Sequence, residues 1–451
     1  MKRYILILSA FFSIQMNAQQ FFLNFKDGTS IPYPSQLIQF TSGSNSHWSI
    51  GNEYHNNFDV NNLSSVSNNK PLVSDTCKLA VITTGTLNSS DIAKPIFDQY
   101  PILNLFLSGS MKELAYYNVH YPTVDARGHT MIMSGRICMR QMDVANKSVK
   151  GIILMNHYTI TRDVESPSIS PYTYADLFAN TGYAVVMADY LGFGITKDYP
   201  QTYLHAESTA KQCLDLLRLS KKWLADQGIS YNSEVYNIGY SQGGGVSMDV
   251  QRFAEASNVK LTKTMAGGGP YDLVGTYDEI IKQQKTNLPV EIPLFVIGMN
   301  YAYNFGFDYS KIFKEPLLSN YGEWLNSKTY NTTEISTKIG TKIISDIVQP
   351  DFLDSSNKQN IQFRKAMQLS STTTGWTSKV LNPILIFHST DDEVVPVLNA
   401  NEMKAKLQSD GYTDANLTTV IKSMGTHGTT GGLFNIYCYC LISGLNIPIS
   451  F

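Results

Sequence analysis

The stretch YNIGYSQGG at residues 236–244 decides the fold. A mostly apolar run at residues 235–238 leads into it, and apolar side chains at helical spacing follow it. This pattern predicts a strand, a sharp turn with Ser241 at its apex, and a helix. A serine on such a turn brings the strand and helix backbones close together, so side chains at Gly239 and Gly243 would collide. Ser241 is therefore a candidate nucleophile, and the alternative is an ordinary glycine-rich turn.

A candidate acid lies downstream of Ser241. A serine hydroxyl needs a neighbouring base, and the base needs an acid to orient it. A predicted strand at residues 383–387 runs into HSTDDEVVP at residues 388–396. Acid loops of the Asp-x-Val-Val-Pro kind carry the catalytic aspartate four residues before the proline, so we predict Asp392 in this role and keep Asp391 as the alternative.

A candidate base follows the last predicted strand. Residues 417–421 form that strand and lead into SMGTHG at residues 423–428. The order serine, aspartate, histidine is the one expected when each group follows a strand of one sheet. We predict His427 as the base and His388, next to the acid loop, as a structural residue.

The negative charge of a tetrahedral intermediate needs two preorganised N–H donors. We predict the backbone of Gln242, directly after the nucleophile, as one donor. The second is expected from the loop that follows a strand at residues 149–155. Here we favour Thr159, whose hydroxyl could add a third hydrogen bond, over Tyr158. The alternative is that both residues only line the pocket.

Two further tyrosines are predicted to line a substrate pocket. Tyr240 directly precedes Ser241, and Tyr190 ends a predicted strand beside it together with Asp189. The Asp189-Tyr190 pair fits a structural or pocket-shaping role. The sequence contains no HExxH, CxxC or phosphate-loop motif, so we expect no metal and no cofactor.

Strands and helices alternate from about residue 72 onward. Two antiparallel strands at 114–121 and 131–139 come first, and long buried strands separated by helices follow. Repeated strand–helix–strand units predict an α/β fold with a mainly parallel sheet and helices on both faces. The expected later strands lie at 149–155, 183–188, 235–238, 261–266, 383–387 and 417–421.

One long insertion interrupts this alternation. Residues 269–383 contain helical patterns at 292–301, 335–347 and 360–369, and they contain no clear strand. A segment of this length is too long for a structureless loop in a compact domain. We predict a helical cap at about residues 271–380, placed over the C-terminal edge of the sheet.

The first residues have the layout of a secretory signal peptide. Lys2 and Arg3 precede an apolar run at residues 4–14, and small residues up to Ala18 follow. The run is far shorter than the roughly 20 apolar residues that span a bilayer. We therefore expect a signal peptide at 1–18, a secreted or periplasmic protein, and no stable transmembrane anchor. Residues 19–70 are predicted to be a β-rich appendage or linker, and residues 71–451 the main domain.

Composition narrows the class of protein. The chain has 451 residues and a net charge of −2, which gives no indication of nucleic-acid binding. Its five cysteines are odd in number and widely spaced, so they do not form a disulfide scaffold. Cys438 and Cys440 lie in an apolar run and are predicted to be packed core, whereas Cys77 is free to pair with another cysteine.

Taken together, the motifs from about residue 110 to 445 resemble the α/β-hydrolase superfamily. They are most similar to its secretory-lipase and esterase branch, which includes the fungal lipase A-type enzymes. This resemblance implies hydrolysis of carboxylic esters of small molecules or lipids under a helical lid. One departure is His157-Tyr158-Thr159, where many relatives have His-Gly. The motifs that carry the resemblance are His157 with Pro167-Ser168, residues 188–192, 239–244, 269–272, 388–396 and 425–427.

Two other hypotheses remain open at this point. A serine peptidase of the prolyl-oligopeptidase or dipeptidyl-peptidase type would share the triad, but the repeats of its propeller domain are not visible. A catalytically silent hydrolase fold that binds carbohydrate or another surface is the second, and the β-rich appendage motivates it. The presence of all three triad residues favours the esterase.

Overall fold

The computed structural model describes residues 77–445 and, before them, only six strand segments. The chain divides into two compact units, one of residues 1–72 with 127–129 and one of residues 73–126 with 130–451. The predicted signal peptide lies outside the described residues. The first unit contains two sheets, with strand orders β2-β1-β6 and β3-β4-β5. Their strands are β1 (Gln20–Phe25), β2 (Ser30–Pro34), β3 (Phe40–Ser42), β4 (His47–Ile50), β5 (Phe58–Asp59) and β6 (Leu63–Ser67).

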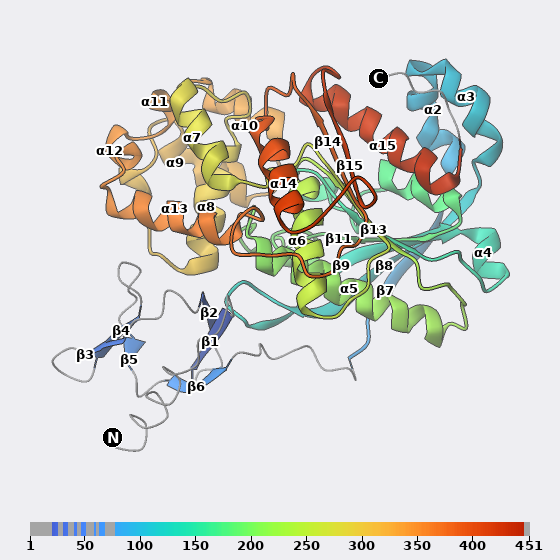
Figure 1. Ribbon diagram of the computed structural model, residues 1–451, viewed down its shortest axis with the longest axis horizontal. Coiled ribbons are helices and arrows are strands. Elements are labelled where there is room, and N and C mark those ends of the chain that lie inside the picture. The colour runs from blue at the N-terminus through green and yellow to red at the C-terminus, as the bar shows by residue number, and fades with distance from the viewer. Residues whose placement is uncertain are drawn as a thin grey trace. The chain divides into compact units, whose positions relative to one another are not determined.

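The second unit is built around a nine-stranded sheet of order β15-β14-β13-β12-β10-β11-β9-β8-β7 (Figure 1). The strands from β15 to β11 run parallel, and β9, β8 and β7 are added antiparallel at one edge. The mainly parallel α/β-hydrolase sheet is thus confirmed. The strands are β7 (Ala80–Asn88), β8 (Glu113–Val124), β9 (Thr130–Arg140), β10 (Ile152–Asn156), β11 (Ala184–Ala188), β12 (Val235–Tyr240), β13 (Lys263–Gly267), β14 (Ile384–Ser389) and β15 (Leu417–Lys422).

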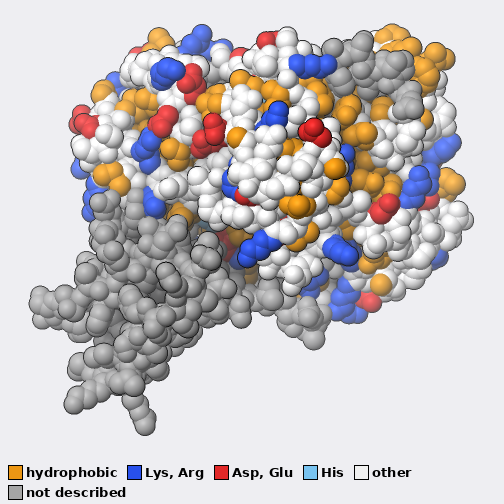
Figure 2. All heavy atoms as spheres, in the orientation of Figure 1, with side chains coloured by type: hydrophobic (Ala, Val, Ile, Leu, Met, Phe, Trp, Pro, Cys, Tyr) orange, Lys and Arg blue, Asp and Glu red, His pale blue; other side chains and the backbone are white. Residues whose placement is uncertain are grey.

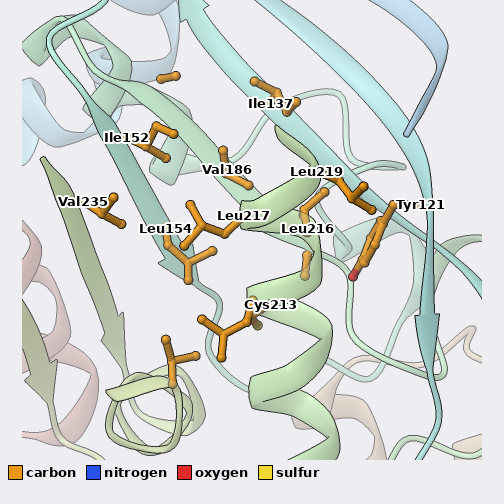
Figure 3. Close-up of a cluster of buried hydrophobic side chains, with 14 of the residues drawn as sticks. Tyr121, Ile137, Ile152, Leu154, Val186, Cys213, Leu216, Leu217, Leu219 and Val235 are labelled. Carbon is orange, nitrogen blue, oxygen red and sulfur yellow. The ribbon is translucent and has the colours of Figure 1, made fainter. Parts of the chain in front are cut away.

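Successive residues of the central strands enter different cores, because side chains alternate between the faces of a sheet. Ile152 and Leu154 of β10 pack with helix α5 on one face, whereas Ile153 and Met155 join the core on the other. Figure 3 shows the first core, where Leu217 of α5 lies among strand side chains. Both faces are therefore covered, which explains why these strands are apolar throughout.

Helices cover the two faces in separate groups, with α5 below and α15 above the strands in Figure 1. One core holds α5 (Ala206–Asp226) and α6 (Gln242–Ala256), and a neighbouring cluster on that face holds α14 (Leu398–Ser409). The opposite core holds α2 (Ser89–Gln99), α3 (Pro101–Leu107), the 3-10 helix η5 (Tyr174–Thr181) and α15 (His427–Ser443).

The insertion folds into helices that gather to the left of the sheet in Figure 1. They have an apolar core of their own, and no strand occurs in the fully described residues 268–383. The predicted helix at 335–347 is two helices, because Gly340 takes a left-handed conformation (φ 79°) and ends the first. The helices are α7 (Leu273–Gln283), α8 (Glu291–Tyr303), α9 (Leu317–Tyr321), α10 (Thr332–Ile339), α11 (Ile344–Ile347), α12 (Pro350–Leu353) and α13 (Lys358–Ser370).

The surface carries no dominant charge on the face shown in Figure 2, where basic and acidic side chains are interspersed. Within the described residues, no helix is both long and apolar enough to cross a bilayer, and no group of side chains is arranged to hold a metal ion. All five cysteines are free thiols. Cys438 and Cys440 are buried, as predicted for packed core.

Candidate active site

The turn between β12 and α6 is strained at Ser241. Its φ of 60° and ψ of −125° are uncommon for a residue with a side chain. The turn is tight enough that a Cβ atom at Gly239 would lie 2.2 Å from the carbonyl oxygen of Gly243. A Cβ atom at Gly243 would lie 2.1 Å from the carbonyl oxygen of Asn156. Glycine is therefore required at both positions, and Ser241 is raised at the C-terminal edge of the sheet.

Three side chains from distant parts of the chain meet at this turn. The Ser241 Oγ lies 2.9 Å from the Nε2 of His427. The Nδ1 of the same imidazole lies 2.6 Å from the Oδ2 of Asp392. The ring can therefore accept the serine proton at one nitrogen while it donates to the carboxylate at the other. These are the three residues that the sequence predicts as nucleophile, base and acid.

Asp392 is held as a carboxylate by its surroundings. Its Oδ1 accepts hydrogen bonds from the amides of Val394 (3.0 Å) and Val395 (2.8 Å). Burial opposes the charge, but the hydrogen bond and charge of His427 outweigh it and lower the pKa of Asp392. Asp391 instead accepts a hydrogen bond from Ser423. The structure thus brings Asp392, and not Asp391, to the imidazole.

His388 lies beneath the acid loop. Its Nε2 donates to the carbonyl of Val395 at 2.9 Å and lies 3.5 Å from the Oδ2 of Asp392. Burial lowers the pKa of His388, so its ring is neutral at neutral pH. This placement matches the predicted structural role.

The backbone of His427 is fixed from two sides. Its N–H donates to the Oε2 of Glu393 at 2.9 Å, and its carbonyl accepts from the hydroxyl of Tyr240 at 2.8 Å. The Tyr240 ring packs against Phe434, with 5.6 Å between ring centroids. The geometry therefore gives Tyr240, predicted as a substrate-binding residue, a second role in positioning the base.

The predicted oxyanion donors come from the first residue of α6 and from the loop after β10. The amide of Gln242 makes no hydrogen bond within the described part of the chain, and the close approach of Gly243 to Asn156 brings the loop after β10 next to it. Thr159 is buried, with its Oγ1 3.0 Å from the hydroxyl of Tyr203. Tyr158 is 61% exposed and lines an outer groove.

Tyr190 lies below this loop. It is buried and stacks on His157, with 3.8 Å between ring centroids, and it lines neither of the two cavities described below. Burial lowers the pKa of His157 to about 4, although the carbonyls of Tyr158 and Asp189 favour its charged form. A neutral His157 on Tyr190 thus supports the loop that carries the second predicted donor.

Two cavities flank the triad. The cap cavity, about 80 Å³, lies between the insertion and the turn and includes Ser241, Gln242 and Val395 in its wall. The outer groove has a volume of about 810 Å³ and is lined in part by residues of α15. Tyr240 and Gly428, the residue after His427, also belong to its wall. Residues of the insertion and Ser241 therefore share the wall of the cap cavity.

Sequence reasoning missed three residues of this site. Glu393 had a signal, because it adjoins Asp392 in the acid loop. Tyr203 and Glu291, both in the wall of the cap cavity, had none, because each comes from a segment with no motif.

Comparisons with known proteins agree with this geometry. A family model described as secretory lipase matches residues 159–429, which is more than half of the chain. A search of curated proteins gave no match. Solved structures with the same fold include a Legionella pneumophila protein assigned as a hydrolase (TM-score 0.68, 19% identity), with 82% of this chain and 99% of that chain covered.

Two enzymes are also similar in fold. One is the rice cell wall degrading esterase LipA from Xanthomonas oryzae, with a TM-score of 0.64, 19% identity, and coverage of 81% of this chain and 96% of that one. The other is Candida antarctica lipase A, with a TM-score of 0.55, 15% identity, and coverage of 82% and 83%. With its mainly parallel sheet, serine turn and family match over residues 159–429, the chain belongs to the secretory lipase family of carboxylic ester hydrolases.

Proposed function

We propose that this protein is an exported serine esterase that works through an acyl-enzyme on Ser241. His427 takes the proton of the serine hydroxyl, and the oxygen attacks the ester carbonyl. His427 then gives this proton to the leaving alcohol, and in a second step it activates the water that releases the acid. The observation that carries the proposal is the pair of contacts of 2.9 Å and 2.6 Å that join Ser241, His427 and Asp392.

The oxyanion donors proposed here are the amides of Gln242 and Thr159. Gln242 begins helix α6, so its N–H points out of the helix end and the helix dipole adds to the field. Thr159 is preferred over Tyr158 because it is buried and contacts Tyr203, a wall residue of the cavity that contains Ser241. Preorganised donors of this kind are typically worth a factor of 10²–10³ in kcat each.

The two cavities suggest which part of the ester lies where. The leaving alcohol must sit on the side of His427, because this residue protonates it, and the outer groove opens next to Gly428. The acyl group then enters the cap cavity, whose volume of about 80 Å³ is below the roughly 150 Å³ that holds benzene. We therefore propose short acyl chains and a larger alcohol part.

Export is proposed from the predicted signal peptide at residues 1–18 and from the secretory family. Secretion of the full-length chain with loss of about 18 N-terminal residues, seen by mass spectrometry of the medium or periplasm, is the expected result. Retention of an uncleaved chain in the cytoplasm would refute it.

The central test compares wild type and Ser241→Ala on p-nitrophenyl esters of increasing chain length, on a feruloyl ester, on a sugar ester and on a peptidyl amide. The sugar ester belongs in the panel because the similar Xanthomonas oryzae enzyme degrades cell walls. We expect the highest rate on short acyl esters, loss of turnover in the variant, and fluorophosphonate labelling of wild type only. Faster cleavage of the amide would support the peptidase alternative. Undiminished turnover by Ser241→Ala would refute the mechanism.

A further inference from the structure

One carboxyl group lies in the wall of the cap cavity, which is otherwise free of charged side chains. Glu291 is in the first turn of α8 and lines the cavity together with Ser241. Among the described residues its carboxyl group forms no hydrogen bond and no ion pair. By contrast, the carboxyl group of Glu334 caps the start of α10, and that of Glu393 accepts from the N–H of His427. Glu291 is half-buried, and its carboxyl group thus lines the cavity without a hydrogen-bond partner from the described protein.

Glu291 lies in a mainly apolar wall. Aliphatic and aromatic side chains such as Ile292, Phe295 and Val348 line the cavity with it, and the hydroxyl of Tyr203 is close enough to interact electrostatically with its carboxyl group. Burial, and after it the negative charge of Asp392, raise the pKa of Glu291 to about 8. Near neutral pH the group is thus a neutral carboxylic acid, which has one hydrogen-bond donor and one free carbonyl acceptor.

An unsubstituted alkyl chain would leave this group without a partner. A cavity that surrounds a bound acyl group removes hydrogen-bond partners from the carboxyl group, and this penalty lowers affinity for the plain chain. A hydroxyl on the acyl group would both accept from and donate to the acid. Sites built to bond a substrate hydroxyl discriminate strongly against the analogue that lacks it.

We propose that Glu291 binds a hydroxyl group on the acyl part of the substrate, which makes short hydroxyacyl esters the favoured substrate class. The inference rests on the proposed function, since it takes the cap cavity to be the acyl site. A competing explanation is that Glu291 only stabilises the start of α8, where an acidic residue interacts favourably with the helix dipole.

The test compares kcat/KM for p-nitrophenyl butyrate with kcat/KM for p-nitrophenyl 2-hydroxybutyrate and 3-hydroxybutyrate, at pH 6.5. Wild type should favour the better hydroxybutyrate about tenfold over butyrate. Glu291→Leu should abolish this preference, whereas Glu291→Gln should retain it within about threefold, because an amide still donates and accepts. Glu402→Gln, which removes an exposed glutamate of α14, is the matched control and should change none of the three kcat/KM values.

The outcomes separate the two proposals. No preference in wild type, an equal loss on all three esters in Glu291→Leu, or loss of the preference in Glu291→Gln would overturn the role of Glu291. A wild-type enzyme that hydrolyses none of the esters would instead overturn the proposed function. Thermal unfolding shows whether Glu291→Leu is folded: a Tm equal to or above that of wild type is expected if the carboxyl group serves substrate, and a lower Tm indicates the helix-stabilising role.

Discussion

Removal of the Tyr240 hydroxyl distinguishes positioning of the base from binding of the substrate. Tyr240→Phe deletes the group that donates to the carbonyl of His427 at 2.8 Å and keeps the ring that packs on Phe434. The Tyr240 ring is held in place by close packing against the backbone of Gly268 and Gly431. A Cβ atom added at either glycine would lie less than 3 Å from an atom of the ring. The variant therefore removes the hydrogen bond to His427 and the interaction of the same hydroxyl with the side chain of Thr430, and it leaves the ring packing in place.

The size of the effect follows from the kind of bond. A neutral hydrogen bond contributes about 0.5–1.5 kcal/mol, which corresponds to about a 2- to 13-fold change in rate. If the bond orients His427, the loss affects the transition state and not substrate binding, so kcat and kcat/KM fall together while KM stays constant. Glu393→Gln removes only the charge of an exposed partner on the other side of His427, and we expect a loss of at most about threefold.

The assay is steady-state hydrolysis of p-nitrophenyl butyrate, with thermal unfolding as the control for folding. A rise in KM at unchanged kcat in Tyr240→Phe would contradict the positioning role and return Tyr240 to the predicted substrate-binding role. The double variant with Glu393→Gln adds a second check, because two groups that hold opposite ends of one residue should show a coupling energy.

Three further predictions concern the acid loop, the turn and a buried carboxyl group. Asp392→Asn should lower kcat about 10³- to 10⁴-fold, whereas Asp391→Asn should stay within about threefold, as measured on the same ester. Gly243→Ala should give little soluble protein on expression, since its Cβ would meet the backbone at Asn156. Gly432→Ala is the matched control: its Cβ would enter open space on α15, so this variant should express normally and have a raised Tm. Because burial raises the pKa of Asp249 to about 7, its protonated form stabilises the fold fully below about pH 4, and this contribution is lost as pH rises through 7. Asp249→Asn should therefore raise Tm by a few degrees at pH 9 and hardly at pH 4, and an equal shift at both values would refute the assignment.

The three residues of the proposed triad could be predicted because each carries a local signature and because parallel strands bring them to one edge of the sheet. The C-terminal ends of parallel strands meet at one edge, so a serine after β12, an aspartate after β14 and a histidine after β15 converge without further information. The choice of Asp392 also has a local cause, since the two amides that hold it belong to Val394 and Val395 of the same motif.

Other parts of the molecule depend on packing that no short pattern reveals. Strand β7 and helices α2 and α3 were not predicted, and Pro95 inside α2 is a residue that ordinarily argues against a helix. Residues 423–428 were predicted only as the segment after the last strand, whereas His427 begins helix α15. Tyr203 and Glu291 reach the site only through the fold of the insertion, whose helices could be predicted but not placed.

Val395 belongs both to the acid loop and to the wall of the cap cavity, so it links the shape of the cavity to the position of Asp392. The amide of Val395 holds Asp392, its carbonyl accepts from His388, and its side chain lines the cap cavity. If the acyl group binds in the cap cavity, as proposed, a substitution of Val395 that enlarges the cavity also disturbs the orientation of Asp392, so a gain in acyl range comes with a loss in kcat. Ile344 and Val348 line the same cavity from α11 and the residue that follows it, and neither contacts the triad loop by a hydrogen bond within the described residues. On the proposed acyl site, substitutions at these cap residues therefore change acyl specificity without loss of reactivity. The insertion lies between β13 and β14, outside the loops that carry Asp392 and His427.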